Sequence, residues 1–265
     1  MPLAAMAQSD EILALTGSAT VLDFGYQEFD DSGTLLNRED GAIPGVAVSL
    51  SHWHGSWLFV GDFSYHAGSV AYSGQTNTGI AITTRTHQAI VDMALRTEYW
   101  QDTTTGLEYA FYFGTGYHRW ERDIRPTRTA GGAPVSGLFE TYQWWLGFAG
   151  VRVVPYESDR ARWLLDARLT RTVNPTITVD HNGLYDNTLL YLGERWGGRL
   201  AFPLHYTLGQ GTSLIVEPYL ERYELGRSAA KRLTRNGVPV GNTSIYEPRS
   251  ETRNFGLMIG INQQM

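Results

Sequence analysis

The chain has 265 residues, no cysteine and a formal net charge of −6. Without thiols it has no disulfides, zinc–thiolate sites or cysteine nucleophiles. The acidic balance argues against a general nucleic-acid binder, because phosphate binding needs a basic face. No segment approaches the roughly 20 apolar residues that a membrane-spanning helix needs. A chain of this composition could still cross a membrane as a closed barrel, whose strands satisfy every backbone polar group.

The N-terminus carries a pattern typical of export. Ala5-Met6-Ala7 is a small-x-small sequence of the kind that precedes signal-peptide cleavage. No charged segment comes before it, so an ordinary flexible N-terminus stays open as the alternative. We expect residues 1–12 to be a signal-peptide remnant or a flexible end. Residues 13–265 should then form a single domain.

Strand-like runs follow one another along the rest of the chain, with no helical period of comparable length. The ten predicted strands span residues 18–30, 43–53, 56–72, 83–99, 106–123, 138–154, 160–179, 188–207, 212–227 and 245–263. Short turns alternate with long polar segments, and the long ones are 31–42, 74–84, 124–137, 180–187 and 228–243. This alternation is typical of outer-membrane barrels, which have short periplasmic turns and long extracellular loops. A hairpin hidden in 228–243 would change the count by two.

Period-two alternation supports the same fold. In the fifth run Leu107, Tyr109, Phe111, Phe113 and Tyr117 share one face, and glycine and polar residues occupy the other. In the sixth run we assign Tyr142, Trp144, Leu146 and Phe148 to the apolar face. A soluble β-sandwich would also alternate, but the strands are long and the apolar face is unusually aromatic. The sequence therefore predicts an all-β, closed antiparallel transmembrane β-barrel of about ten strands in the bacterial outer membrane.

Arginines continue the predicted lipid-facing side toward the long loops. We expect them to ring the outer interface, where the planar guanidinium suits the phosphates of lipopolysaccharide. The alternative is ordinary snorkelling of arginine toward the aqueous interface. The residues are Arg85, Arg119, Arg171, Arg222 and Arg253.

Charges of both signs alternate with the lipid-facing positions and should face the lumen. A buried ion without a partner costs several kcal/mol, so we expect them to pair and fill a narrow barrel. A small-solute, porin-like channel is the alternative, since glycines share this face. The predicted lumen charges are Asp23, Asp62, Asp92, Arg96, Glu98, Glu108, Asp166, Arg168, Arg195, Arg199, Glu217 and Glu221.

The predicted arrangement of ten strands resembles that of the omptins, the surface proteases of enteric bacteria. The likeness covers most of the chain, and its best local match is Gly116-Tyr117-His118-Arg119-Trp120-Glu121-Arg122. The resemblance implies a ten-stranded barrel in which Tyr117 and Arg119 contact lipopolysaccharide. It also matches Glu28 to an acidic residue near the top of the first omptin strand.

The catalytic residues of the family are not matched. Omptins carry two aspartates just past the third strand, where this chain reads Tyr72-Ser73-Gly74-Gln75-Thr76-Asn77. The omptin Asp-x-His pair is replaced by adjacent Asp180 and His181, which remain weak catalytic candidates. Neighbouring strand residues point to opposite faces unless a bulge intervenes. A dyad needs hydrogen-bond reach, so we expect no omptin-type proteolysis.

No other motif indicates a cofactor or a metal. His52 and His54 share a face, but no third ligand is near them in the sequence. We therefore predict a non-enzymatic barrel whose extracellular loops bind a ligand or a protein partner, or which scaffolds the envelope. An omptin-like protease or lipid A-modifying hydrolase, and a narrow channel, are the alternatives. The expected partners are outer-membrane lipids and lipopolysaccharide, and a protein at the loops or in the lumen.

Overall fold

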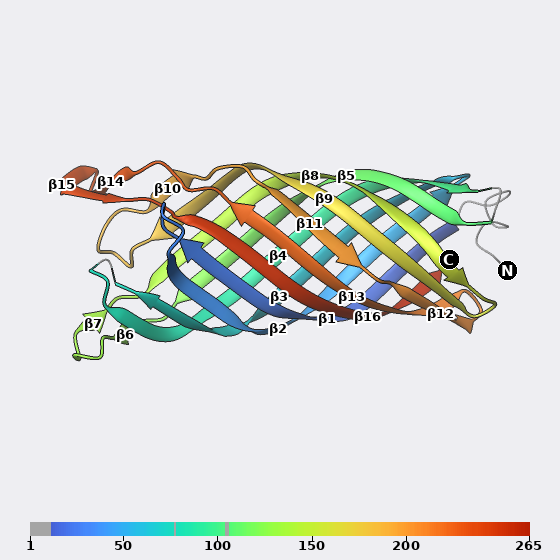
Figure 1. The fold of residues 1–265 in the computed structure, drawn as a ribbon, viewed down its shortest axis with the longest axis horizontal. Coiled ribbons are helices and arrows are strands. Elements are labelled where there is room, and N and C mark those ends of the chain that lie inside the picture. The colour runs from blue at the N-terminus through green and yellow to red at the C-terminus, as the bar shows by residue number, and fades with distance from the viewer. Residues whose placement is uncertain (1–11, 77, 104–105) are drawn as a thin grey trace.

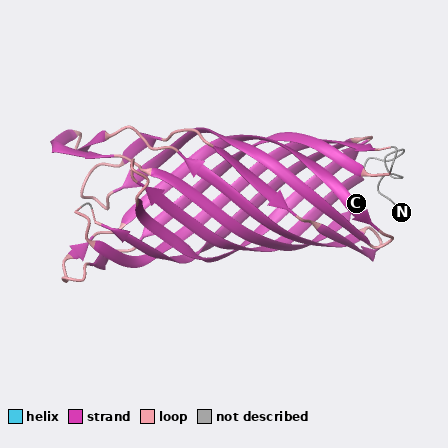
Figure 2. Cartoon of the chain, viewed as in Figure 1, coloured by secondary structure: helices cyan, strands magenta, loops and turns pink. Residues whose placement is uncertain are grey.

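The computed structural model describes residues 12–76, 78–103 and 106–265, and it shows a closed antiparallel barrel (Figure 1). Figure 2 shows strands and loops throughout, and the described residues contain no helix long and apolar enough to cross a membrane. The strands are β1 (Ile12–Phe29), β2 (Leu35–His54), β3 (Trp57–Gln75), β4 (Ala81–Asp102), β5 (Glu108–Ile124), β6 (Thr127–Arg128), β7 (Pro134–Val135), β8 (Leu138–Glu157), β9 (Ala161–Asp180), β10 (Thr188–Tyr191), β11 (Trp196–Ala201), β12 (Leu204–Gly209), β13 (Thr212–Leu225), β14 (Lys231–Arg235), β15 (Val238–Ile245) and β16 (Arg249–Gln264).

The barrel closes where β1 pairs with β16 along almost its whole length, from Ala14 opposite Gln264 to Phe29 opposite Arg249. The eighth strand of the wall is built from three pieces, β10, β11 and β12, which pair with β9 or β13 on either side. Counting these pieces as one gives ten wall strands. The predicted fold class and strand number are therefore confirmed.

Two hairpins rise from the long-loop end and stay outside the wall. β6 pairs only with β7, and β14 only with β15, in separate two-stranded sheets. The second hairpin spans residues 231–245, so it lies almost wholly in the segment 228–243 that we expected to be the likeliest to hide one, and the wall keeps its ten strands. Both hairpins lie at the end opposite the C-terminus (Figure 1). Following the rule that long loops face outward, we call this the extracellular end.

Several boundaries differ from prediction. β1 begins at Ile12, so residue 12 belongs to the wall, and the rest of the proposed signal-peptide remnant lies outside the described residues. The expected loop 31–42 shrinks to a short turn, because β2 already begins at Leu35. Polar residues in this segment face the lumen or the outer interface, which is why composition alone suggested a loop.

Side chains alternate between membrane and lumen as the pattern predicts, with two corrections. Phe111, Leu169 and Phe255 are more than half exposed on the outer surface. In β8, however, the aromatic face of Tyr142, Trp144 and Phe148 points into the lumen and is buried, while Trp145 faces outward. Asp23 was predicted to face the lumen, yet it is exposed, in the outward phase of Val21.

The lumen is filled in layers. A large apolar cluster occupies the extracellular half, with Phe24, Tyr26, Trp120, Tyr142 and Ile177 at its centre. A smaller cluster that includes Leu58, Trp100 and Leu164 lies near the short turns. Charged residues occupy the middle. Close packing of such layers is what a narrow barrel uses as its core.

Candidate functional site

The middle of the lumen holds a chain of ion pairs in which arginines and carboxylates alternate. Arg96 contacts Asp62 and donates from Nε to Oε1 of Glu98 at 2.7 Å. Arg152 continues the chain, at 3.0 Å from Glu98 and 2.8 Å from Asp166. Each arginine lies between two acids, so its charge is compensated where water is scarce.

Other predicted lumen charges lie in separate pairs, which are Arg162–Glu108 at 2.6 Å, Arg199–Glu217 at 2.5 Å and Arg168–Glu221 at 3.2 Å. Arg195 was also predicted to face the lumen, but this prediction is wrong. Its side chain is exposed and donates to the carbonyl of Glu194 instead of a lumen acid. Sequence reasoning left Arg152 and Arg162 out of the network. Strict alternation could have found Arg162, which opposes the outward Trp163, but not Arg152, which is in step with Phe148 on the face that the sequence assigned to the membrane.

His118 of β5 has an acidic partner in the lumen. His118 Nδ1 lies 2.5 Å from Oδ1 of Asp92, and the imidazole stacks on Trp144 at 3.9 Å between ring centroids. The other ring nitrogen of His118 is buried and has no hydrogen-bond partner in the described part of the chain. An acid–histidine pair without a nucleophile in reach lacks the third group that covalent hydrolysis uses.

A second charged cluster lies at the extracellular end and is centred on Arg122, which is completely buried. Its Nη1 donates to Glu140 at 2.6 Å and to Glu28 at 3.2 Å, and its Nη2 donates to Glu39 at 2.6 Å. The guanidinium also lies 4.4 Å from the ring centroid of Tyr26. One cation therefore serves three buried carboxylates, which come from three different strands.

Neutral donors complete the cluster. Glu39 accepts hydrogen bonds from Thr86 at 3.0 Å and from Gln88 at 2.5 Å, and Asn37 donates to Glu28 at 2.5 Å. Such charge-assisted bonds partly replace the water that a buried carboxylate loses. Of this cluster, the sequence pointed only to Glu28, through the omptin resemblance.

The loop that carries β14 and β15 is anchored to this cluster from inside. Glu247 accepts a 2.5 Å hydrogen bond from the Tyr142 hydroxyl, and its backbone exchanges bonds with Ser228 at the other root of the loop. Burial, together with the charges of Glu28 and Glu140, raises the pKa of Glu247 well above its ordinary value. When it carries a proton, this carboxyl can accept from Tyr142 without adding to the negative charge of the cluster.

The same loop is held from outside by Asp186. This carboxylate accepts from the Thr234 hydroxyl at 2.7 Å and from the backbone N–H groups of Asn236 and Gly237 at 3.0 and 2.9 Å. These hydrogen bonds, that from Thr234 foremost, lower the pKa of Asp186. Arg235 adds two bonds to the carbonyl of Leu184. The β14–β15 hairpin is therefore docked on the neighbouring loop.

Asp180 and His181 do not form a dyad. Asp180 accepts from the backbone of Asn182, whereas the buried His181 lies 3.4 Å from the Thr188 hydroxyl. An irregularity in β9 near Pro175 shifts the alternation, so that Ile177, Val179 and His181 share the buried phase. The two side chains thus point apart, as adjacent strand residues do.

The predicted outer arginines all lie on the outward phase near the extracellular end. Arg119 pairs with Glu121 at 2.6 Å, and Arg171 pairs with Glu194 at 3.3 Å. Arg85 donates to the carbonyl of Ser69, and the Tyr117 hydroxyl donates to Gln143. Arg222 and Arg253 lie opposite each other in register, and both contact Glu251.

Within the described residues, no group of three or more histidine, aspartate or glutamate side chains has the geometry to hold a metal ion. The charged clusters consist of direct ion pairs and hydrogen bonds among side chains of the barrel itself. Their arrangement stabilises a filled lumen and anchors the loop that carries β14 and β15.

Comparison with known proteins finds likeness in fold without likeness in sequence. No protein-family model and no curated protein matches the chain. Among solved structures, it is similar to the outer membrane protease OmpT from Escherichia coli, with 14% identity over 97% of this chain and 98% of that chain and a TM-score of 0.58. It is also similar to the translocator domain of the autotransporter NalP from Neisseria meningitidis, with 13% identity, coverage of 97% and 90%, and a TM-score of 0.50.

These identities show a shared fold alone. The chain has the fold of Gram-negative outer-membrane barrels, and that fold implies an outer-membrane location. The likeness to OmpT agrees with the omptin resemblance at the level of architecture. It assigns no activity, because the fold serves several functions.

Proposed function

We propose that this protein is a non-enzymatic outer-membrane barrel whose extracellular loops form the working surface. The observation that supports the proposal is the contrast between the lumen of the barrel and its extracellular loops. The lumen is packed with apolar layers and ion pairs. Two of the loops, in contrast, form hairpins outside the wall, and the larger is anchored by both Glu247 and Asp186.

Loop anchoring favours recognition because a preorganised surface loses less conformational entropy on binding. The segment from Gly226 to Tyr246 carries Arg227, Lys231, Arg232 and Arg235 and no acidic residue, although the whole chain has a net charge of −6. A basic hairpin on an acidic protein suits an anionic ligand or protein partner.

The test compares the wild-type barrel with a variant in which residues 232–244 are replaced by a two-residue turn. Both proteins, labelled and held in lipid nanodiscs, are applied to protein and glycan arrays. We expect the variant to lose binding that the wild type shows, while heat-modifiable gel migration shows that both are folded. Shortening the β6–β7 loop provides the matched control.

The same protein preparations also test the two alternative functions, a hydrolase and a channel. Cleavage of fluorogenic peptides or lipid A in the presence of lipopolysaccharide, abolished by Asp180→Ala or His181→Ala, would make the protein an enzyme. Stepwise conductance in planar bilayers, altered in Arg96→Met or Arg168→Met, would make it a channel. Either result would contradict the proposal.

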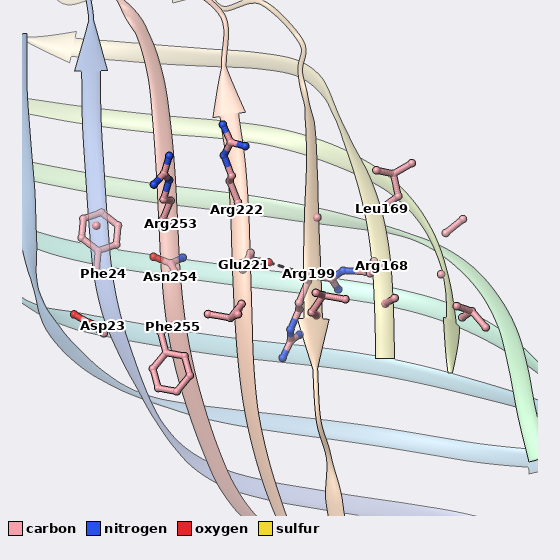
Figure 3. A pocket seen from close by; sticks show the side chains of 18 of the residues that line it. Asp23, Phe24, Arg168, Leu169, Arg199, Glu221, Arg222, Arg253, Asn254 and Phe255 are labelled. Atoms are coloured by element: carbon pink, nitrogen blue, oxygen red, sulfur yellow. Dashed lines mark hydrogen bonds and ion pairs between the residues drawn. The ribbon is translucent and has the colours of Figure 1, made fainter. Parts of the chain in front are cut away.

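We further propose that Arg85, Tyr117, Arg119 and Arg171 contact lipopolysaccharide at the outer interface. Their outward position near the extracellular end supports this role. The matched ion pairs of Arg119 and Arg171 hold the guanidinium groups in place. Arg222 and Arg253 were predicted to act in the same way, and they lie opposite each other on neighbouring strands (Figure 3) with Glu251 between them as a shared partner.

A further inference from the structure

The tip of the β14–β15 hairpin consists of an asparagine followed by a glycine. Arg235 pairs with Val238, so Asn236 and Gly237 form a two-residue turn between the strands. Both have a positive φ, of 49° and 76°, which is the pattern of the type I′ turn that this dipeptide favours. Figure 1 shows the hairpin projecting beyond the wall at the extracellular end. The turn is open to water, because Asn236 and Gly237 are both exposed.

An asparagine followed by a glycine is prone to deamidation, because the glycine has no Cβ to hinder ring closure. The backbone nitrogen of the glycine loses its proton to the solvent, attacks Cγ of the asparagine side chain and displaces ammonia. Water then opens the resulting succinimide ring at either carbonyl group, which gives aspartate or isoaspartate. The reaction exchanges an amide for a carboxylate and needs no co-reactant besides water. In isoaspartate the main chain runs through the side-chain carbons and is longer by a methylene group.

In the folded hairpin, Asp186 holds the nitrogen that would attack. Its Oδ1 accepts from the backbone N–H of Asn236 at 3.0 Å, and its Oδ2 accepts from that of Gly237 at 2.9 Å. The proton that must leave is therefore held on a carboxylate. The negative charge of Asp186 also disfavours removal of this proton, because an amide anion would form beside it. The docked hairpin thus protects Asn236 from the reaction that its sequence favours.

A second asparagine–glycine pair, Asn182 and Gly183, provides an internal comparison. Its φ values, 52° and 79°, are nearly the same as those of the hairpin tip. Here the side-chain amide is held, because Nδ2 of Asn182 donates to the carbonyl of Gly137 at 2.8 Å. The side chain of Asn236 makes no hydrogen bond in the described part of the chain. Loss of the contacts with Asp186 should therefore expose Asn236 to attack and leave Asn182 protected.

We propose that Asn236 is a deamidation site protected by Asp186, and that its deamidation releases the β14–β15 hairpin. In the isoaspartate product, the added methylene group separates the two N–H groups that Asp186 binds, so its two oxygens no longer reach both. In the aspartate product, a second carboxylate lies next to Asp186 and repels it. The release is permanent, because ammonia is lost. This inference concerns the docking of the hairpin and does not rest on what the extracellular loops bind.

The test ages the full barrel in lipid nanodiscs at mildly alkaline pH and follows both asparagines by peptide mass spectrometry. Asp186→Asn should speed deamidation of Asn236 about ten-fold, as expected for losing a hydrogen bond to a charged group. The rate at Asn182 should not change. In the chain unfolded by urea, the two asparagines should react at similar rates, because the dipeptide is the same. An unchanged rate at Asn236 in Asp186→Asn, or an equal acceleration at Asn182, would overturn the protective role of Asp186.

Release of the hairpin is measured separately, as trypsin cleavage after Arg232, which lies away from the altered bond. Deamidated wild type should be cut faster than unaged protein, while gel migration shows that the barrel stays folded. Asn236→Gly is the matched control, because glycine keeps the turn at positive φ without strain and cannot deamidate. Ageing should leave its cleavage unchanged. Faster cleavage of aged Asn236→Gly to the same extent, or complete deamidation of the wild type without faster cleavage, would overturn the proposed release.

Discussion

The middle of the lumen and its extracellular end both bury charge, but they balance it differently. In the middle, Arg96 and Arg152 alternate with Asp62, Glu98 and Asp166, so cations and anions nearly match. At the extracellular end, Arg122 is surrounded by several carboxylates. The charges in the middle of the lumen are therefore balanced by ion pairs. The carboxylates at the extracellular end depend on a single cation and on protonation.

Removal of the single cation should give the largest effect. Arg122→Met leaves Glu28, Glu39 and Glu140 buried without it, so the free energy of unfolding should fall by about 3 to 5 kcal/mol. Urea unfolding of the refolded barrel, followed by tryptophan fluorescence, measures the change. The outward Arg119→Met, whose pair with Glu121 is exposed, should cost less than about 1 kcal/mol. Equal losses of unfolding free energy in the two variants would contradict the expected difference between the buried and the exposed arginine.

A break in the balanced region should cost less. Arg96→Met removes the partner of Asp62 and Glu98, but Glu98 keeps Arg152 and the side chain of Asp62 is 34% exposed. We expect a loss of about 2 kcal/mol in the same unfolding experiment. A loss as large as that of Arg122→Met would show that the middle region depends on each cation equally.

The proton at the extracellular end should produce a dependence on pH. Because burial raises the pKa of Glu247, the folded state keeps a proton that the unfolded chain releases. Stability from this group is present below the ordinary glutamate pKa of about 4.3 and is lost as pH rises through the raised value. Glu247→Gln should flatten this slope, measured as unfolding free energy against pH. An unchanged slope would contradict the assignment.

The outer anchor of the same loop should respond to pH in the opposite sense, and only locally. The pKa of Asp186 is lowered, so its contribution is present above the ordinary aspartate pKa and is lost as pH falls through the lowered value. Asp186→Asn should free the β14–β15 hairpin, seen as faster proteolytic cleavage at Arg235 with unchanged global unfolding. The exposed Asp159→Asn at a short turn is the control, and equal cleavage in both variants would argue against docking by Asp186.

Much of the wall could be predicted from the sequence, because alternation and turn length are local properties. The outward faces of β5, β9 and β16 followed directly from their apolar phases. The face of β8 was misassigned because both of its sides carry tryptophan, so hydrophobicity does not separate membrane from core. Asp23 was misplaced because charge was taken as a sign of the lumen, although the outer interface also carries charge.

The clusters were harder to foresee, because their members come from distant segments. Glu39 lay in a segment expected to be a loop. Glu247, which lies just before β16, and Arg122 of β5 are brought together through the Tyr142 hydroxyl of β8, to which both are hydrogen-bonded. Register between strands is a long-range property that alternation does not provide. The period-two alternation of β5 could by itself have placed Arg122 inward, since Arg122 lies on the same face of the strand as His118 and Trp120.

The three-piece eighth strand has a consequence for the motions of the wall. Leu192 to Arg195 interrupt it, and they face the irregular part of β9, where Asn174 has a positive φ of 49° and Pro175 has no N–H to donate. Ladder bonds are sparser there than along β1 and β16. Among the backbone amides of the wall, those at this position should therefore exchange with deuterium first.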